Sequence, residues 1–170
     1  VTHGGIGSCL EALGVGSGVG VGLGLSYGVR GIKGGDKKVD RLRVGSWNIG
    51  TLQGKSIELV KILRKRKINI ACVQETNWVG SKARDVDGYK LWYSGSDRRR
   101  NDVGILVDEE LREQVVEVKR VSDRVMTIKL VLGGFTSNIC SAYAPQVGLA
   151  NEEKKRFWEV LYEVVRGVPS

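Results

Sequence analysis

The stretch from Leu42 to Val73 constrains the fold of this chain more than any other part of it. Leu42–Asn48 has the pattern of a β-strand, and Ile68–Val73 is a mostly apolar run that suits a central buried strand. Between them, Lys55–Lys67 spaces its apolar residues as an α-helix does, and its last four residues are cations, which suit the negative end of a helix dipole. A strand, a helix and a second strand in so short a stretch predict a layered α/β fold.

The chain after this stretch predicts further strands. A polar loop is expected over Thr76–Gly88, and Gly133-Gly134 predicts a tight hairpin turn. Five other runs have strand character: Tyr89–Tyr93, Val103–Val107, Val115–Val121, Val125–Leu132 and Phe135–Ala142. A β-rich part is therefore expected to follow the strand–helix–strand start.

A second helix is predicted over Glu152–Arg166. Asn151 is its expected N-cap, because an asparagine side chain there can accept a hydrogen bond from a free backbone amide. Gly167 and then Pro169 end it. Its apolar residues recur at helical spacing and predict one buried face, made of Phe157, Trp158, Leu161, Val164 and Val165.

The start of the chain differs from the rest in composition. Residues 1–35 hold 13 of the 24 glycines, and every second residue from Gly14 to Gly24 is a glycine. Such a segment loses much backbone entropy on folding and offers few side chains to pack. Residues 1–38 are therefore expected to be disordered and residues 39–170 to form the folded domain. A dinucleotide-binding fingerprint is excluded because no G-x-G-x-x-G occurs there.

Membrane insertion is not expected. The run from Ala12 to Tyr27 carries no charge, but its glycines make a stable spanning helix unfavourable. The start of the chain also lacks the basic region of a signal peptide.

The charge balance favours an anionic partner. The chain has a net charge of +8, and residues 36–170 contribute +7 of it, with 25 basic and 18 acidic residues. Nucleic acid is the commonest partner of so basic a chain. A basic surface that serves only solubility stays open as the alternative.

The three cysteines lack the spacing of a metal site. Cys72 and Cys140 lie in apolar runs, where cysteine behaves as a small hydrophobic residue. Both are expected to be reduced and buried, which indicates an intracellular protein, with the nucleus among the compartments open to it.

Residue counts exclude several kinds of catalytic site. The only histidine is His3, far from the predicted strands, and no two cysteines lie close together in the sequence as metal ligands do. Zinc-type sites and Ser-His-Asp or Cys-His nucleophiles are therefore excluded. Carboxylate chemistry remains, in which Mg²⁺ is held by one or two carboxylates and by substrate phosphate.

One segment has some likeness to a phosphate-binding P-loop. Gly50–Ser56 lies between a strand and a helix and contains Gly-Lys-Ser. A P-loop has four residues between its glycines, whereas this segment has three, so its backbone cradle would be one amide short. An ordinary strand-to-helix turn is the better interpretation.

Four motifs occur in a defined order along the chain. They are Ser46-Trp47-Asn48-Ile49-Gly50, Cys72-Val73-Gln74-Glu75-Thr76, Asn101-Asp102-Val103-Gly104-Ile105-Leu106 and Ser141-Ala142-Tyr143-Ala144-Pro145-Gln146. Together they resemble the endonuclease/exonuclease/phosphatase superfamily, especially the endonuclease domains of LINE-type retrotransposons and craniofacial development protein 2-like sequences. The resemblance covers about Arg41 to Gly167.

The resemblance implies a fold and a site. The fold is a four-layer α/β sandwich of mixed, mainly antiparallel sheets with flanking helices. Asn48 would belong to the network that orients the metal and the attacking water, and Glu75 would ligate Mg²⁺ or Mn²⁺. Tyr143 would contact the scissile phosphate. A departure is Gly50, where several DNA-repair members carry an aspartate that assists metal binding. Taken singly, Asn48 would be read as a strand-end cap, Glu75 as a solvated acid and Tyr143 as an aromatic at the core edge; the resemblance favours the site roles instead.

Two further features suggest contacts with nucleic acid. Arg98, Arg99 and Arg100 are expected in a loop, where they would neutralise backbone phosphates without reading sequence. A solvated run of charge is the alternative. Trp78 could stack on a sugar or base, or could be a packing residue.

Motifs that this superfamily places further downstream are missing from the sequence. No strand ending in Gly-Asp-Phe-Asn follows the second helix, and there is no Ser-Asp-His type motif. The chain also starts at Val1, with Met126 as its only methionine. It is therefore expected to be the N-terminal part of a truncated domain that keeps one sheet, loses much of the other and exposes apolar surface.

The function that the resemblance implies is that of a Mg²⁺-dependent phosphodiesterase of the retroelement DNA endonuclease type. This chain alone is expected to be weak or inactive, because removing members of a catalytic unit costs orders of magnitude in rate. A non-catalytic, basic nucleic-acid-binding remnant is the alternative. A phosphatase acting on phosphoinositides or small phosphate esters is a second alternative.

Overall fold

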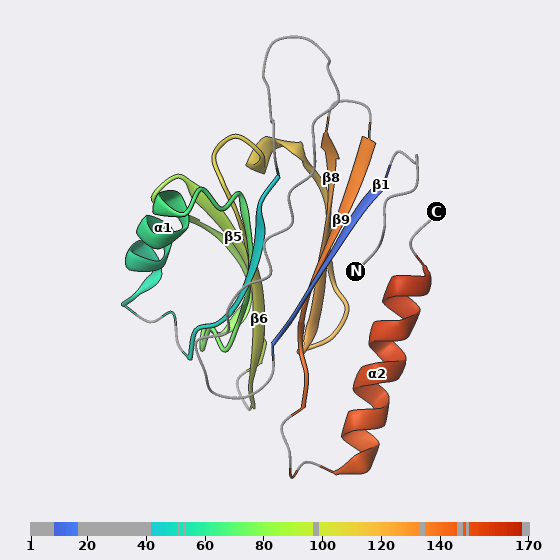
Figure 1. Ribbon diagram of the computed structural model, residues 1–170. Helices are drawn as coiled ribbons and strands as arrows, with labels where there is room; N and C mark the ends of the chain where they lie inside the picture. The colour runs from blue at the N-terminus through green and yellow to red at the C-terminus, as the bar shows by residue number, and fades with distance from the viewer. Residues whose placement is uncertain are drawn as a thin grey trace.

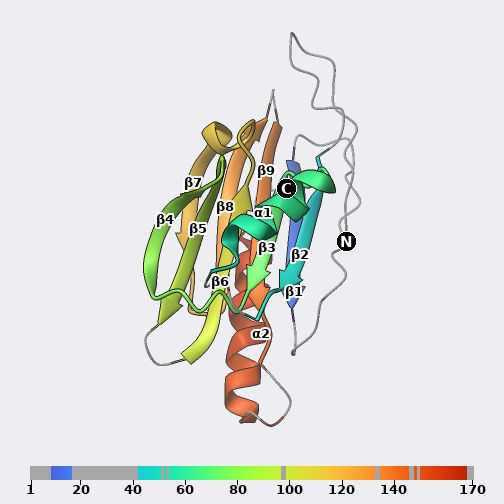
Figure 2. The ribbon, with the colours of Figure 1, turned by 90° about the vertical axis from the view of Figure 1, so that its left-hand side faces the viewer.

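Two β-sheets lie face to face between two helices (Figures 1 and 2). The structure is a computed structural model that describes residues 9–16, 42–50, 52, 54–96, 99–132, 135–145, 148 and 150–167. Viewed from the side, the layers run helix, sheet, sheet, helix (Figure 1). The expected four-layer α/β sandwich is therefore confirmed.

The five-stranded sheet has the strand order β2-β3-β6-β5-β4. The strands are β2 (Val44–Asn48), β3 (Ile70–Gln74), β4 (Gly80–Val86), β5 (Tyr89–Ser96) and β6 (Arg99–Val107). β2 and β3 are parallel, and the other neighbours are antiparallel. Helix α1 (Ser56–Lys65) connects the parallel pair, so the predicted strand–helix–strand start is confirmed.

The four-stranded sheet has the order β1-β9-β8-β7. The strands are β1 (Cys9–Gly16), β7 (Val115–Arg120), β8 (Val125–Leu132) and β9 (Phe135–Tyr143). A short 3-10 helix, η1 (Arg112–Gln114), precedes β7, and α2 (Asn151–Arg166) follows β9. Strands β7, β8 and β9 form an antiparallel meander, whereas β1 pairs with β9 in parallel.

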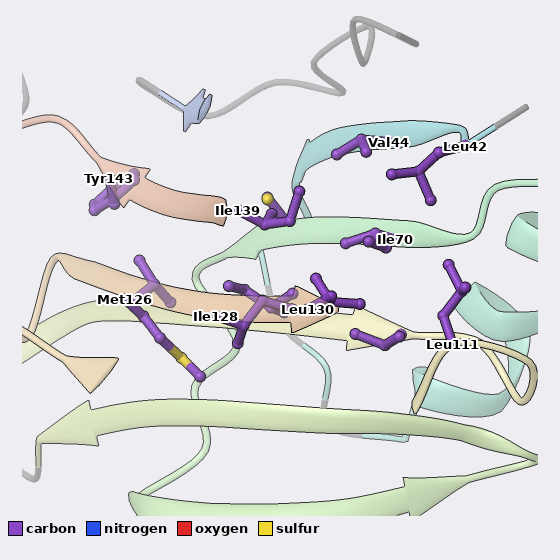
Figure 3. Packing of buried hydrophobic residues seen from close by; sticks show 13 residues of the cluster. Leu42, Val44, Ile70, Leu111, Met126, Ile128, Leu130, Ile139 and Tyr143 are labelled. Carbon is purple, nitrogen blue, oxygen red and sulfur yellow. The ribbon is translucent and has the colours of Figure 1, made fainter. Parts of the chain in front are cut away.

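Three hydrophobic clusters join the layers. The largest fills the space between the two sheets and includes Val44, Ile70, Ile128 and Ile139 (Figure 3). A second cluster joins α1 to the outer face of the five-stranded sheet, which α1 covers in Figure 2. The third joins α2 to the four-stranded sheet through Phe157 and other side chains. Successive side chains of a strand point to opposite faces of its sheet, so one set packs between the sheets and the other packs against a helix.

The segment predicted as a polar loop over Thr76–Gly88 contains strand β4. Six of its seven residues are exposed or half-buried, and only Val86 is buried. A strand at the edge of a sheet needs few apolar residues, since one of its sides pairs with no other strand and faces solvent. The loop prediction was wrong here because β4 has no apolar alternation to reveal it.

Strand β1 lies within the segment that was expected to be disordered. Its eight residues pair in register from Cys9 opposite Thr136 to Gly16 opposite Tyr143. These residues therefore form a strand within a segment for which disorder was expected, since an edge of β9 can bond to a strand backbone whatever its side chains are. The rest of residues 1–38 lies outside the described residues, as does the turn at Gly133-Gly134.

Both sheets are present, with five and four strands among the described residues, and the expected loss of part of one sheet stays a prediction. The β7-β8-β9 meander forms from local pairings, which need no strand from elsewhere, and β1 adds a fourth strand.

Helix α2 differs in two details from its prediction. Asn151 is the first helical residue rather than the N-cap, which is Ala150. Trp158 was assigned to the buried face but is 56% exposed, while Phe157 and Leu161 are buried as predicted. Fewer apolar residues of α2 pack against the sheet than the spacing of its apolar residues predicts.

Cys72 and Cys140 are buried thiols that form no disulfide, as expected. Burial raises the pKa of the Cys140 thiol to about 12. Neither helix in the described part of the chain combines the length and the apolar character that crossing a bilayer requires.

Candidate active site

The ends of three strands converge at one edge of the sandwich. Asn48 ends β2, Glu75 directly follows β3, and Tyr143 ends β9. The parallel register places Asn48 opposite Gln74, so β2 and β3 end together. Strand β9 belongs to the other sheet and ends at the same edge. The structure therefore brings together the three residues that the sequence singled out.

Direct contacts fix β9 against β3. The Cys72 thiol lies 3.6 Å from the Cys140 carbonyl oxygen, to which it donates, and the Ser141 hydroxyl donates to the Val73 carbonyl oxygen at 3.4 Å. At the end of the strands, the Tyr143 hydroxyl donates to Glu75 Oε1 at 2.5 Å. The Glu75 carboxylate is thus held between the two sheets.

Glu75 has an unusual backbone conformation. Its φ is 59°, in the left-handed region that residues with a Cβ adopt at a cost of about 1–2 kcal/mol. Its amide donates to the Asp102 carbonyl oxygen at 2.8 Å, which ties it to the neighbouring strand β6. Strain of this kind persists where the surrounding structure holds it, and it gathers at functional sites.

The loops after β2 and β3 are tied to each other. The Leu52 amide donates to the Thr76 carbonyl oxygen at 3.0 Å, and Asn77 Nδ2 donates to the Gly50 carbonyl oxygen at 2.9 Å. Asn77 also has a positive φ, 56°. The two loops therefore form one connected rim around the site.

Asn48 is almost completely buried. Its Oδ1 accepts a hydrogen bond from the Gly50 amide at 3.2 Å, and Gly50 has a φ of 69°. This local turn orients the Asn48 side chain at the strand end. The capping interaction that was the alternative interpretation of Asn48 is present, and it also holds the residue at the site.

Gln74 is a site residue to which the sequence reasoning gave no role. Its side chain is fully buried between the sheets, and its Nε2 donates to the Ser46 hydroxyl at 3.3 Å. Its Oε1 has no hydrogen-bond partner among the described protein atoms. A buried polar atom of this kind is costly and rare. A glutamine that ends an otherwise apolar strand was the signal available in the sequence.

Trp78 is a packing residue in this structure. Its ring meets the ring of buried Tyr93 edge to face, with centroids 5.4 Å apart. The Arg84 guanidinium lies 4.8 Å from the Trp78 ring centroid. Stacking of a base on that face would require Arg84 to move aside.

Two of the three consecutive arginines lie in a strand rather than in the expected loop. Arg99 and Arg100 are the first two residues of β6, which pairs with β5, while Arg98 lies outside the described residues. The prediction of a loop is wrong for the two described arginines. The pairing of β5 with β6 continues beyond the apolar residues of the two strands and includes the polar residues next to the turn.

The described residues at this edge offer oxygen atoms as ligands for a metal. Glu75 carries the carboxylate, and Asn48 and Gln74 bring amide oxygens to the same edge. Within the described part of the chain, no three His, Cys, Asp or Glu residues cluster as a metal cage would. This donor set fits a hard cation such as Mg²⁺, which keeps much of its coordination for water and phosphate.

Similar proteins were found among curated sequences. Craniofacial development protein 2 of Bos taurus is 25% identical over 128 residues, and that of Tragulus javanicus is 23% identical over the same length. Each alignment covers 74% of this chain but 22% of the relative, so the chain spans about a fifth of these proteins. No protein-family model matches the sequence.

Three solved structures share the fold. They are the endonuclease domain of TRAS1, a telomere-specific non-LTR retrotransposon (TM-score 0.53, 19% identity), an AP endonuclease from Archaeoglobus fulgidus (0.57, 20%) and D. rerio TDP2 complexed with a single-stranded DNA product (0.55, 13%). The matches cover 74–75% of this chain and 52–56% of those chains. The chain therefore has the endonuclease/exonuclease/phosphatase fold and spans about half of it.

Proposed function

We propose that this chain carries part of the active site of a Mg²⁺-dependent phosphodiesterase that acts on nucleic acid, of the retroelement DNA endonuclease type. The observation that carries the proposal is the hydrogen bond between Tyr143 and Glu75, because it joins two of the expected site residues across the two sheets. Resemblance in sequence and fold to endonucleases supports the substrate class.

Each residue would have a separate task at the strand ends. Glu75 would hold Mg²⁺ or Mn²⁺, and the bound metal would neutralise negative charge that develops on the phosphate oxygens. The Tyr143 hydroxyl, now bonded to Glu75, would donate to a phosphate oxygen beside it. Asn48, fixed by its turn, would help to orient the attacking water.

We also propose that the 170-residue chain has little or no activity by itself. Its sequence supplies no Gly-Asp-Phe-Asn or Ser-Asp-His type motif, and its only histidine is His3. A general base and a second phosphate contact are therefore absent from the set of residues described above. Loss of such members of a catalytic unit commonly lowers the rate by about 10³-fold or more.

Nicking of supercoiled plasmid DNA by the purified chain tests the activity. With Mg²⁺ present, the wild-type rate should equal that of Glu75→Ala. Nicking that is clearly faster than in Glu75→Ala would overturn the proposed inactivity. Equal rates would leave metal binding as the test of the site.

Binding of Mn²⁺, followed by electron paramagnetic resonance, tests the site without requiring turnover. Glu75→Ala should abolish most of the binding, whereas Glu110→Ala, at an exposed acid that follows the other end of β6, should not. Equal binding by the two variants would contradict a metal site at Glu75.

A non-catalytic nucleic-acid-binding remnant is the second candidate, and the charge of +7 over residues 36–170 favours it. Duplex binding that weakens steeply with salt, yet survives both EDTA and Glu75→Ala, would support this candidate over the metal-dependent one. Binding that requires the metal would support the first.

A further inference from the structure

Arg124 contacts Tyr143 at three points. The Tyr143 amide donates to the Arg124 carbonyl oxygen at 2.9 Å, and Arg124 Nη1 donates back to the Tyr143 carbonyl oxygen at 3.2 Å. The Arg124 guanidinium carbon also lies 5.4 Å from the centroid of the Tyr143 ring. One arginine thus holds the backbone of Tyr143 and covers its ring.

The turn between β7 and β8 holds Arg124 in place. The amides of Val121 and Ser122 both donate to the Val125 carbonyl oxygen, at 3.0 and 3.1 Å. The Arg124 amide donates to the Ser122 hydroxyl at 3.2 Å. The backbone around Arg124 is therefore set by local hydrogen bonds, independently of the strand ends at Glu75.

Tyr143 lies at the end of the core between the sheets, and its side chain is almost wholly buried (Figure 3). The core fixes the ring on one side, and the Arg124 guanidinium lies on the ring as a cation. A tyrosine ring has few rotatable bonds, so contacts on the ring and on its own backbone determine where the hydroxyl points. Here the hydroxyl points to Glu75 Oε1.

We propose that Arg124 is a positioning residue that holds the Tyr143 hydroxyl against the Glu75 carboxylate. That this positioning matters for catalysis rests on the proposed function. The positioning itself rests only on the contacts of Arg124 with Tyr143. Arg124 acts through Tyr143, so removing it loosens the hydroxyl without removing either partner of the hydrogen bond.

The experiment uses the full chain labelled with ¹³C at the Cζ atom of tyrosine, because this resonance responds to hydrogen bonding of the hydroxyl. Tyr143→Phe identifies the signal by its disappearance. Glu75→Gln gives the position of the signal when the carboxylate is lost. Arg124→Met should move the signal toward that position, and Arg124→Lys, which keeps a cation but loses the guanidinium fork, should lie between Met and wild type.

Arg120 supplies a matched control from the same hairpin. The Arg120 side chain donates to the carbonyl oxygens of Tyr93 and Lys82, both at 3.1 Å. These two hydrogen bonds do not involve Tyr143. Arg120→Met should therefore leave the Tyr143 signal at its wild-type position.

An unmoved Tyr143 signal in folded Arg124→Met would overturn the inference. If Arg124→Met does not fold, Arg124→Lys decides, since a wild-type signal in that variant would overturn it equally. A displaced signal in a chain that binds no Mn²⁺ would support the positioning role and count against the proposed function alone. The two failures are thus distinguishable.

Discussion

The hydroxyl of Tyr143 and the carboxylate of Glu75 form a 2.5 Å hydrogen bond between residues that are 68 positions apart in the sequence. The bond joins the end of β9 in one sheet to the loop after β3 in the other. A hydrogen bond to a carboxylate is shorter and stronger than one between neutral groups. It therefore contributes to holding the two sheets together.

Tyr143→Phe should lower the free energy of unfolding. A hydrogen bond to a charged group contributes about 1.5–3 kcal/mol, and the variant loses this bond while keeping the ring in the core. Urea denaturation measures the change. Tyr162→Phe is the control, because Tyr162 is 64% exposed and its loss of a hydroxyl should change stability by less than about 0.5 kcal/mol. Equal stability of the two variants would show that the bond contributes nothing.

Stability should fall between pH 10 and pH 12 because of Tyr89. Burial, reinforced by the charge of Asp108, raises the pKa of Tyr89 to about 12, and its hydroxyl donates to the Ile68 carbonyl oxygen at 2.7 Å. The unfolded chain releases this proton near pH 10, before the folded chain does. The stabilisation is thus complete below pH 10 and is lost as pH rises toward 12, by on the order of 2 kcal/mol.

Urea denaturation at a series of pH values measures this loss. Tyr89→Phe should flatten the decline between pH 10 and pH 12, although it starts from a lower stability because the Ile68 carbonyl loses its partner. Tyr162→Phe should retain the wild-type slope. A slope that is the same in all three proteins would rule out Tyr89 as the source.

Cys72 and Cys140 should resist thiol reagents in the folded chain. Cys72 is fully buried, and burial raises the pKa of Cys140 to about 12, so little thiolate forms near neutral pH. In a Cys9→Ser background, Ellman's reagent at pH 8 should give almost no colour until denaturant is added, and then two equivalents. Rapid reaction without denaturant would contradict the burial of these thiols.

Much of the fold could be predicted because its central elements are strongly patterned. Strand β3 is a mostly apolar run, and α1 has clear helical spacing, so burial and period agree there. Strand β4 gave no such signal because it is an exposed edge strand. Strand β1 gave none because its pairing depends on the backbone of β9, which no local pattern in residues 9–16 reveals.

The site was less accessible to sequence reasoning than the fold. Periodicity predicted that Asn48, Glu75 and Tyr143 lie at strand ends. Only the resemblance of the motifs to the superfamily indicated that the three residues lie close together in one site. Which faces of two sheets pack together is a tertiary property, so the bond from Tyr143 to Glu75 could not follow from local pattern. Gln74 and Arg124 were missed for the same reason, since their roles depend on contacts across strands and sheets.

Gly95 should be essential to the segment that carries Glu75. A Cβ atom at Gly95 would lie 2.1 Å from the Trp78 carbonyl oxygen and 3.0 Å from Asp102 Oδ1. The closer atom belongs to the backbone, which cannot turn away as the end of a flexible side chain could. Because the Glu75 amide is bonded to the Asp102 carbonyl, strain introduced at Gly95 acts on both ends of the Glu75 segment.

Gly95→Ala is therefore expected to destabilise the chain by about 1–3 kcal/mol, as overpacking does. Gly45→Ala is the matched control in strand β2, since its Cβ would meet only ordinary contacts, the nearest being Ile68 Cδ1 at 3.5 Å. Urea denaturation should separate the two variants, and the Tyr143 Cζ resonance should move only in Gly95→Ala. Equal stability, with the resonance unmoved in both, would mean that the segment from Glu75 to Trp78 yields freely and that its strained conformation is not imposed by β5.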